Sequence, residues 1–433
     1  MKEQTRVTLG IILWAVVLLG LIVAGVSYII NTEKSAVDEI AESVAESAPE
    51  VPVVNIERVE PEAVGLDSRH LAYIADKVEE YIAKGATKGA VVTVVRDGKI
   101  AYMEAFGERE HGGEAMTIDT RFDLASLTKP VVTATAIMQL VERGNLRLDE
   151  RVSNLIPEFE DYAEGKGKKR RVVYATVGDL MSHCSGLRPY VALTRLEEDY
   201  HDRELDKGVL LDYIAHSERL GAPREVTKYS CLNYILLGEI VERCSGMSLE
   251  EYARTNIFVP LKMSNTCYRP DAEYALLAAP TSPIGAEEEL RGVVNDPLAR
   301  EVMGGVSGNA GLFSTAEDLA IFVAMILERG EWQGVRVLTP RGVEELFTQP
   351  DDVKTTRTLA WERLSNSFEA LEDGQESAVF VHTGATGTSI HIDREHDMAV
   401  IILTNRTHVD GSSRDIKELR RSVATIASYA IVE

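Results

Sequence analysis

The chain has 433 residues, of which 45% are hydrophobic and 27% are charged, so it is long enough to bury a large core. Its formal net charge is −23 at pH 7. A surplus of acidic groups of this size repels phosphates and anionic lipid headgroups. The composition therefore argues against a nucleic-acid-binding protein and against adhesion to an anionic membrane surface.

The first element in the chain is an apolar run over residues 7–30 that contains no charged residue. At the rise of an α-helix this run spans roughly 36 Å, which is enough to cross a bilayer. The run is longer than the apolar region of a secretory signal, and residues 28–31 make a poor cleavage site. An uncleaved anchor is therefore favoured over the alternative of a cleaved signal.

Basic residues precede the apolar run and acidic residues follow it. By the positive-inside rule, residues 1–6 form a cytoplasmic tail and the rest of the chain lies outside the cytoplasm, in the periplasm or at the cell surface. Residues 31–61 are acidic and contain no aromatic side chain, which is typical of a linker. We expect a single-pass membrane protein with a transmembrane helix at 7–30 and one catalytic domain at 62–433.

Strand patterns occur near both ends of that domain. After an amphipathic helix at 66–84, residues 90–96 and 99–102 are typical of strands, and Asp97-Gly98 between them is a strong hairpin signal. Near the C-terminus we expect three more strands and a closing helix, at 378–382, 389–393, 398–403 and 413–431. The sequence between the two groups is rich in helical patterns, with an insert at about 145–300. These elements predict an α/β fold of the α+β type, with one antiparallel sheet assembled from both ends and flanked by helices.

Ser126 and Lys129 form a Ser-x-x-Lys pair, the most informative motif in the chain. Residues i and i+3 are neighbours on a helix, so a lysine of lowered pKa can take the serine proton and create a nucleophile. Pro130 fits a helix only within the first turn, and residues 131–143 are apolar at helical spacing, with Gly144 as the expected stop. We therefore expect Ser126 at or very near a helix N-terminus, where backbone N–H groups can stabilise an oxyanion. By itself, the tetrapeptide also fits an ordinary solvated helix start.

Tyr229 lies shortly before an apolar helical pattern at 234–244. A tyrosine at this place can present its phenol to a cleft, and a neighbouring lysine would lower its pKa and make it a usable base. The alternative is a tyrosine that only packs. His183 and His216 are expected to pack or to cap rather than to bind a ligand.

His382, Thr383 and Gly384 end a predicted strand. Glycine at such a position allows close approach of a ligand to the backbone, and free N–H groups can hold a substrate or an oxyanion. The alternative is a simple turn. The glycine-rich segment 304–316 lacks the Gly-Lys-Ser/Thr ending of a phosphate loop, so we expect a flexible or cleft-lining loop there.

The chain contains four cysteines, which permit two disulfides in three connectivities or four free thiols: Cys184, Cys231, Cys244 and Cys267. Their spacing does not fit a zinc site. We assign neither a metal nor a cofactor. A Gly-x-Ser-x-Gly nucleophile elbow does not occur in the sequence.

In this order, the motifs resemble those of the serine hydrolases related to class C β-lactamases. That family includes penicillin-binding-protein-like carboxypeptidases, D-aminopeptidases and esterases. The resemblance covers approximately residues 62–430. The segments that carry it are 122–130, 180–187, 229–239, 305–319, 382–387 and 403–406.

The resemblance implies a role for each matching residue. Ser126 would be the acylated nucleophile, and Lys129 the amine that helps to deprotonate it. Tyr229 would relay the proton to the leaving group and activate water for deacylation. The triplet His382–Gly384 takes the place of a Lys-Thr-Gly strand that lines the cleft, and the backbone N–H groups of Ser126 and Ala385 would form the oxyanion hole. The implied fold, an antiparallel sheet flanked by helices plus an all-helical lobe, agrees with the element pattern.

Two departures from the family pattern bear on the substrate. The β-lactamases carry Tyr-x-Asn, whose amide helps to hold the substrate, whereas this chain has Cys231 there and Asn233 two residues later. A thiol cannot replace the two-way hydrogen bonding of an amide. The lysine of Lys-Thr-Gly, a fixed charge for a substrate carboxylate, is here His382, which is mostly neutral near pH 7. Both changes favour an esterase or D-peptidase-like enzyme over a true β-lactamase.

The leading hypothesis is a membrane-anchored serine acyl hydrolase that forms a Ser126 acyl-enzyme with a small-molecule or peptide-like ester or amide. The first alternative is a penicillin-recognising receptor or cell-wall regulator with weak or no turnover, and the second is a structural membrane protein that retains the fold. If Lys129 or Tyr229 must lose a proton, kcat/KM should rise from neutral to mildly alkaline pH.

Overall fold

A computed structural model describes residues 56–110, 112–282, 289–364, 378–409 and 413–432. The chain from Asn55 onward forms one compact unit. The expected membrane span at 7–30 lies outside the described residues, as does the linker up to residue 55. Among the helices of the described residues, none combines the length and the apolar character that a membrane crossing requires.

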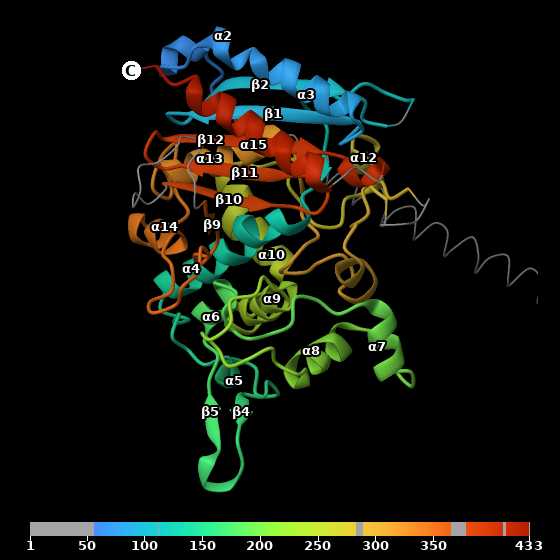
Figure 1. The fold of residues 1–433 in the computed structure, drawn as a ribbon, viewed down its shortest axis with the longest axis vertical. Coiled ribbons are helices and arrows are strands. Elements are labelled where there is room, and N and C mark those ends of the chain that lie inside the picture. Colours follow the sequence, from blue (N-terminus) through green and yellow to red (C-terminus); the bar gives the residue numbers. More distant parts are fainter. Residues whose placement is uncertain (1–55, 111, 283–288, 365–377, 410–412, 433) are drawn as a thin grey trace, which may run out of the picture. The chain divides into compact units, whose positions relative to one another are not determined.

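The centre of this unit is a six-stranded antiparallel sheet in the order β2-β1-β12-β11-β10-β9 (Figure 1). The strands, in that order, are Lys99–Gly107, Gly89–Arg96, Met398–Thr404, Ser389–Asp393, Val379–Thr383 and Glu362–Arg363. Strand β1 pairs with β12 from Ala90 opposite Thr404 to Arg96 opposite Met398. The prediction of one sheet assembled from both ends of the chain is therefore confirmed.

The hairpin between β1 and β2 turns at Asp97 and Gly98, whose φ angles are 52° and 68°. Two left-handed residues give the turn type whose twist matches that of the flanking strands, so the hairpin prediction is confirmed. Strand β2 continues to Gly107, five residues beyond the predicted end at 102. The sequence of this extension shows little alternation of apolar and polar residues, and the extension is held by pairing with β1, for example Ala105 with Val91.

Helices cover both faces of the sheet (Figure 1). On one face lie α2 (Ser68–Leu71), α3 (Tyr73–Ala83) and α15 (Ser413–Tyr429), and on the other lies α13 (Ala316–Leu327). The predicted single helix at 66–84 is thus divided in two at Ala72. The buried stripe of α15 recurs at helical spacing and packs against α3 and the sheet: Ile416, Leu419, Val423 and Ala427.

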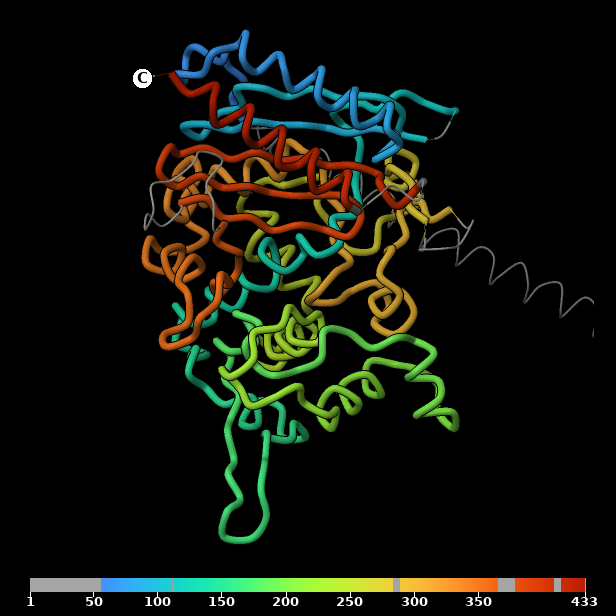
Figure 2. Tube along the Cα trace, viewed as in Figure 1, coloured from blue at the N-terminus to red at the C-terminus, as the bar shows by residue number. Residues whose placement is uncertain are grey.

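Helices also dominate the segment from about 145 to 300, most of which lies below the sheet in Figure 2. They are α5 (Val152–Leu155), α6 (Val177–Met181), α7 (Leu193–Asp199), α8 (Lys207–His216), α9 (Cys231–Ser245), α10 (Leu249–Ala253), α11 (Val259–Leu261) and α12 (Ala272–Leu276). Helix α9 begins at the cap Ser230, whose hydroxyl accepts from the Asn233 N–H, and ends at Gly246 in the left-handed region.

The same segment contains a hairpin that was not expected, β4 (Tyr162–Glu164) with β5 (Arg171–Val173). It extends away from the helices (Figure 2). Its strands have three residues each and are largely exposed, so they lack the alternation of apolar and polar residues by which strands are recognised.

The remaining elements connect the sheet to the helical region. They are α4 (Thr135–Glu142), α14 (Pro340–Leu346), and two short strand pairs, β3 (Phe122–Asp123) with β6 (Phe313–Ser314) and β7 (Glu331–Trp332) with β8 (Val335–Arg336). The pairing of β3 with β6 brings the glycine-rich segment 304–316 beside the Ser-x-x-Lys pair.

Candidate active site

Ser126 lies in a short 3₁₀ turn, Ala125–Leu127, that follows β3. Next comes a π-helical segment, Lys129–Ala134, and only then the regular helix α4. The prediction that Ser126 lies at or very near a helix N-terminus is confirmed, although the first turns are 3₁₀- and π-helical rather than α-helical. In the π-helical segment the hydroxyl of Thr135 donates to the Pro130 carbonyl at 3.0 Å, five residues earlier. Within the described residues, the backbone N–H of Ser126 has no acceptor.

A buried carboxylate holds the turn that carries Ser126. Asp123 accepts from the N–H of Ala125 at 2.8 Å and from the N–H of Asn295 at 2.7 Å. Ala125 has a φ of 47°, a strained value for a residue other than glycine. Burial raises the pKa of Asp123 to about 6. We infer that Asp123 stabilises the strained turn, a role that the sequence motif did not reveal.

Lys129 is fully buried directly beneath Ser126. Its Nζ donates to Ser126 Oγ at 3.0 Å, to the Asn309 carbonyl at 2.8 Å and to Cys231 Sγ at 3.6 Å. Burial alone would lower the pKa of Lys129, but the neighbouring Cys231 and Tyr229 outweigh it, so the pKa is raised overall. This direction is opposite to the lowered lysine pKa expected from the sequence.

Tyr229 completes the cluster from the segment that precedes α9. Lys129 Nζ and the Arg357 guanidinium each lie 5.1 Å from the centre of its ring. Burial raises the pKa of Tyr229, and the charge and hydrogen bond of Lys129 together with the hydrogen bond of Ser126 offset only part of that rise. The phenol therefore keeps its proton at neutral pH, and positive charge on Lys129 would stabilise its ionised form.

His183 fixes the segment of Tyr229. Its ring centre lies 4.5 Å from that of Tyr229, and its Nδ1 accepts from the Ser230 N–H at 3.1 Å. Burial lowers the pKa of His183 well below its usual value, so the ring is neutral. The expectation that His183 packs and caps is confirmed.

The predicted site residues meet at one cleft of about 320 Å³. Ser126, Tyr229, His382, Thr383, Gly384 and Ala385 line it, and Lys129 lies below its floor. Thr383 ends β10, and Ala385 follows in the turn to β11. Among the described residues, the N–H of Ala385 has no acceptor, as is also true of Ser126. Two unpaired N–H donors thus border the cleft that holds the Ser126 hydroxyl.

His382 is 4% exposed, and neither ring nitrogen has a partner within the described part of the chain. Burial lowers its pKa well below the usual value, so the ring is neutral and supplies no fixed charge. Four basic residues also line the cleft: Arg406, which ends the motif at 403–406, and Arg357, Lys417 and Arg420, which lie outside the motifs. Among the described residues that line it, the one carboxylate is that of Glu362, which pairs with Arg357 at 2.8 Å.

All four cysteines are free thiols, so the alternative of two disulfides is not realised. Cys231 is the one that contributes to the site, through its contact with Lys129. The glycine-rich segment 304–316 reaches the site through the Asn309 carbonyl, which accepts from Lys129, but none of its residues is among those that line the cleft.

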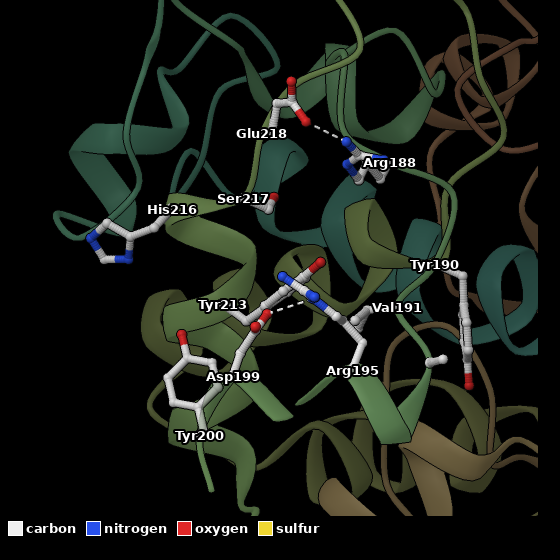
Figure 3. A pocket seen from close by; sticks show the side chains of 11 residues that line it. Arg188, Tyr190, Val191, Arg195, Asp199, Tyr200, Tyr213, His216, Ser217 and Glu218 are labelled. Atoms are coloured by element: carbon white, nitrogen blue, oxygen red, sulfur yellow. Dashed lines mark hydrogen bonds and ion pairs between the residues drawn. The ribbon is translucent and has the colours of Figure 1, made fainter. Parts of the chain in front are cut away.

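A larger hollow of about 810 Å³ lies in the helical region, between α7, α8 and residues 188–192 (Figure 3). Its arginines are paired, Arg195 with Asp199 at 2.9 Å and Arg188 with Glu218. None of the predicted site residues lines it. The cationic cleft at Ser126 is therefore the candidate active site.

The family model described as Beta-lactamase matches residues 74–425. The chain belongs to the β-lactamase family. It is 32% identical over 388 residues to a protein of Bacillus subtilis named N-acetylmuramyl-L-alanine amidase, a match that covers 81% of this chain and 84% of the relative. It is 29% identical over 408 residues to a putative D-alanyl-D-alanine carboxypeptidase of Salmonella gallinarum, which covers 84% and 89% of the two chains.

The solved structure of EstCE1, described as a hydrolase with promiscuous acyltransferase activity, superposes with a TM-score of 0.65. The identity is 21%, and the match covers 82% of this chain and 99% of the other, so the likeness shows a shared fold. Family and fold together confirm the resemblance found in the sequence. The chain is a serine acyl hydrolase of the β-lactamase family.

Proposed function

We propose that this enzyme is a membrane-anchored hydrolase, extracytoplasmic in location, that cleaves an ester or amide through an acyl-enzyme on Ser126. The observation that carries the proposal is the contact of the Ser126 hydroxyl oxygen with Lys129 Nζ at 3.0 Å, beside Tyr229 and two unpaired N–H donors. A nucleophile, a proton-accepting pair and oxyanion donors are what acyl transfer requires. The membrane anchor rests on residues 7–30 of the sequence alone.

The proposed reaction has two steps. In the reacting form, the pair formed by Lys129 and Tyr229 has lost one proton. Ser126 Oγ attacks the substrate carbonyl carbon, its proton passes to that deprotonated pair, and the pair hands the proton to the leaving group as the carbonyl–leaving-group bond breaks. Water then attacks the acyl carbon and gives a proton to the same pair. That proton returns to Ser126 Oγ when the acid product leaves. The N–H groups of Ser126 and Ala385 would stabilise the oxyanion in both steps.

The rim of the cleft favours an esterase or D-peptidase-like activity over a true β-lactamase. Cys231 cannot hold a substrate amide as an asparagine would, and His382 is neutral. Arg357 and the exposed Lys417 nevertheless offer positive charge to an acyl substrate that carries an anionic group away from the reacting carbonyl. The names of the relatives, an amidase and a putative carboxypeptidase, support a peptide-like substrate.

Intact-mass spectrometry of the full-length chain after brief exposure to a mixed panel tests this proposal. The panel holds short acyl esters, a D-Ala-D-Ala peptide and a penicillin, each of distinct mass. We expect an adduct on Ser126 from an ester or the peptide, released with time and absent in Ser126→Ala. Penicillin binding that survives in Ser126→Ala, without turnover of any compound, would indicate the receptor alternative instead.

A further inference from the structure

Arg420 is a charged residue on the buried face of α15, between Leu419 and Val423, and is only 8% exposed. Within the described residues it forms no ion pair with a carboxylate. Burial lowers its pKa to about 10, which still leaves it charged at neutral pH. A buried charge without a counter-ion is costly unless its donors are satisfied.

Nε and Nη2 of Arg420 donate to the carbonyls of a single turn. Nη2 donates to the Gly384 carbonyl at 2.9 Å and to the Thr388 carbonyl at 2.9 Å, and Nε donates to the Gly387 carbonyl at 3.2 Å. This turn, residues 384–388, joins β10 to β11 and contains Ala385. The C-terminal helix thus fastens the backbone that borders the active-site cleft.

One of these bonds bears directly on the oxyanion donor. The Gly384 carbonyl and the Ala385 N–H belong to the same peptide group, and the described backbone contains no cis peptide bond. In a planar trans peptide the C=O and the N–H point in opposite directions. Because Arg420 draws the Gly384 oxygen toward α15, the Ala385 N–H is aimed to the other side, away from the guanidinium.

The charge of Arg420 also strengthens that donor. A cation that hydrogen-bonds a peptide oxygen polarises the peptide and makes its N–H a better donor. The turn is tied to the nucleophile's strand as well, since Thr386 Oγ1 donates to the Asp123 carbonyl at 2.8 Å and Thr388 Oγ1 to the Leu124 carbonyl at 3.0 Å. These hydrogen bonds join the two backbone segments that carry the proposed oxyanion donors.

We propose that Arg420 is a positioning residue, which orients and polarises the Gly384–Ala385 peptide as an oxyanion donor and acts through the backbone rather than through substrate contact. The inference rests on the proposed function of Ser126. It predicts that Arg420 contributes to kcat and leaves KM largely unaffected, because the donor is needed when the carbonyl oxygen becomes an oxyanion.

The test compares Arg420→Gln and Arg420→Lys with Arg421→Gln in the full-length chain. Arg421 is the next residue of α15, its side chain is 76% exposed, and its one ion pair within the described part of the chain is with Glu418, so it is a matched control. The substrates are p-nitrophenyl acetate and its thionoester, in which sulfur replaces the carbonyl oxygen. Sulfur is a weak acceptor, so the thionoester draws little benefit from an oxyanion donor.

We expect Arg420→Gln to lower kcat for the oxygen ester by about 10- to 100-fold, less than the full loss of one oxyanion donor. KM and the thionoester rate should change little, so the ester-to-thionoester rate ratio falls, while Arg420→Lys is intermediate and Arg421→Gln is unchanged. The ratio does not depend on how much of a variant is folded. It therefore separates positioning from a loss of folded protein.

An unchanged ratio in Arg420→Gln, or a rise in KM at constant kcat, would overturn the inference, because the residue would then be structural or would bind substrate. In both cases the proposed function would still stand, provided that the unsubstituted enzyme forms the acyl adduct on Ser126. If the unsubstituted enzyme forms no Ser126 adduct with the oxygen ester, the proposed function fails, and this inference fails with it.

Discussion

Replacing Lys129 by methionine removes the ammonium and keeps a side chain of similar length. The variant loses the hydrogen bonds to Ser126 Oγ, the Asn309 carbonyl and Cys231 Sγ. An orphaned buried carbonyl costs about 1–3 kcal/mol, whereas removal of a fully buried charge relieves a desolvation penalty of several kcal/mol. Since the two effects oppose each other, we expect the free energy of unfolding to change by less than about 3 kcal/mol.

The effect on catalysis should be much larger. A positioned general acid or base contributes about 10²- to 10⁴-fold, so acylation of Ser126 should slow by that factor in Lys129→Met. In the unsubstituted enzyme the pKa values of Lys129 and Tyr229 are both raised, so kcat/KM should rise with pH above neutrality as the pair loses a proton. Without the Lys129 charge, the pKa of Tyr229 rises further, so the rise of kcat/KM with pH should move to higher pH.

The assay is the rate at which the acyl adduct appears on Ser126, followed by intact mass after mixing with p-nitrophenyl acetate. Lys228→Met is the control, because Lys228 is an exposed lysine one residue before Tyr229. Thermal unfolding shows whether each variant is folded. An adduct that forms equally fast in Lys129→Met, or a kcat/KM profile of the unsubstituted enzyme that is flat from pH 5 to 9, would refute the assignment of Lys129.

Two further predictions concern the phenol and a buried carboxyl. Tyr229→Phe keeps the ring contact with His183 at 4.5 Å but removes the hydroxyl. Acylation of Ser126 should slow about 10²-fold or more, and the acyl adduct should persist because the attacking water loses its base. An adduct that decays at the rate of the unsubstituted enzyme would contradict this. Asp318, which accepts from Thr266 Oγ1 at 2.7 Å, has its pKa raised by burial to about 6. A carboxyl group whose pKa is raised in the folded state stabilises that state below the ordinary pKa of 3.8, and this stability is lost as pH rises through 6. Between pH 4 and pH 7, the free energy of unfolding of the unsubstituted protein should therefore fall by about 2–3 kcal/mol relative to that of Asp318→Asn. Urea unfolding of both proteins at the two pH values measures this, and a difference that stays constant would disprove the linkage.

Local patterns predicted much of the sheet. The strand expected at 389–393 has those bounds as β11, and the closing helix begins at residue 413 as predicted. The turn at Asp97-Gly98 follows from backbone freedom at two adjacent residues. The exposed β4–β5 hairpin escaped prediction because its residues show no buried face.

The site was predictable where its residues lie in short motifs. A catalytic or substrate-binding role was predictable for Ser126, Tyr229 and His382 because each lies in a short sequence motif. Arg420 was missed, although a charge on an otherwise apolar helix face was a signal. Its partner Gly384 is 36 residues away in the chain, and the partner of Lys129 at Asn309 is 180 residues away.

By itself, the sequence indicated the family and the sheet and predicted Ser126 as the nucleophile, because motifs and periodicity act between residues close in the chain. Only the tertiary structure decided that Lys129 is buried against Tyr229 and Cys231, that His382 is neutral, and that a C-terminal arginine holds the turn of Ala385. The physical reason is that a pKa and a backbone orientation depend on burial and on neighbouring charges, and folding brings those neighbours together from distant parts of the chain.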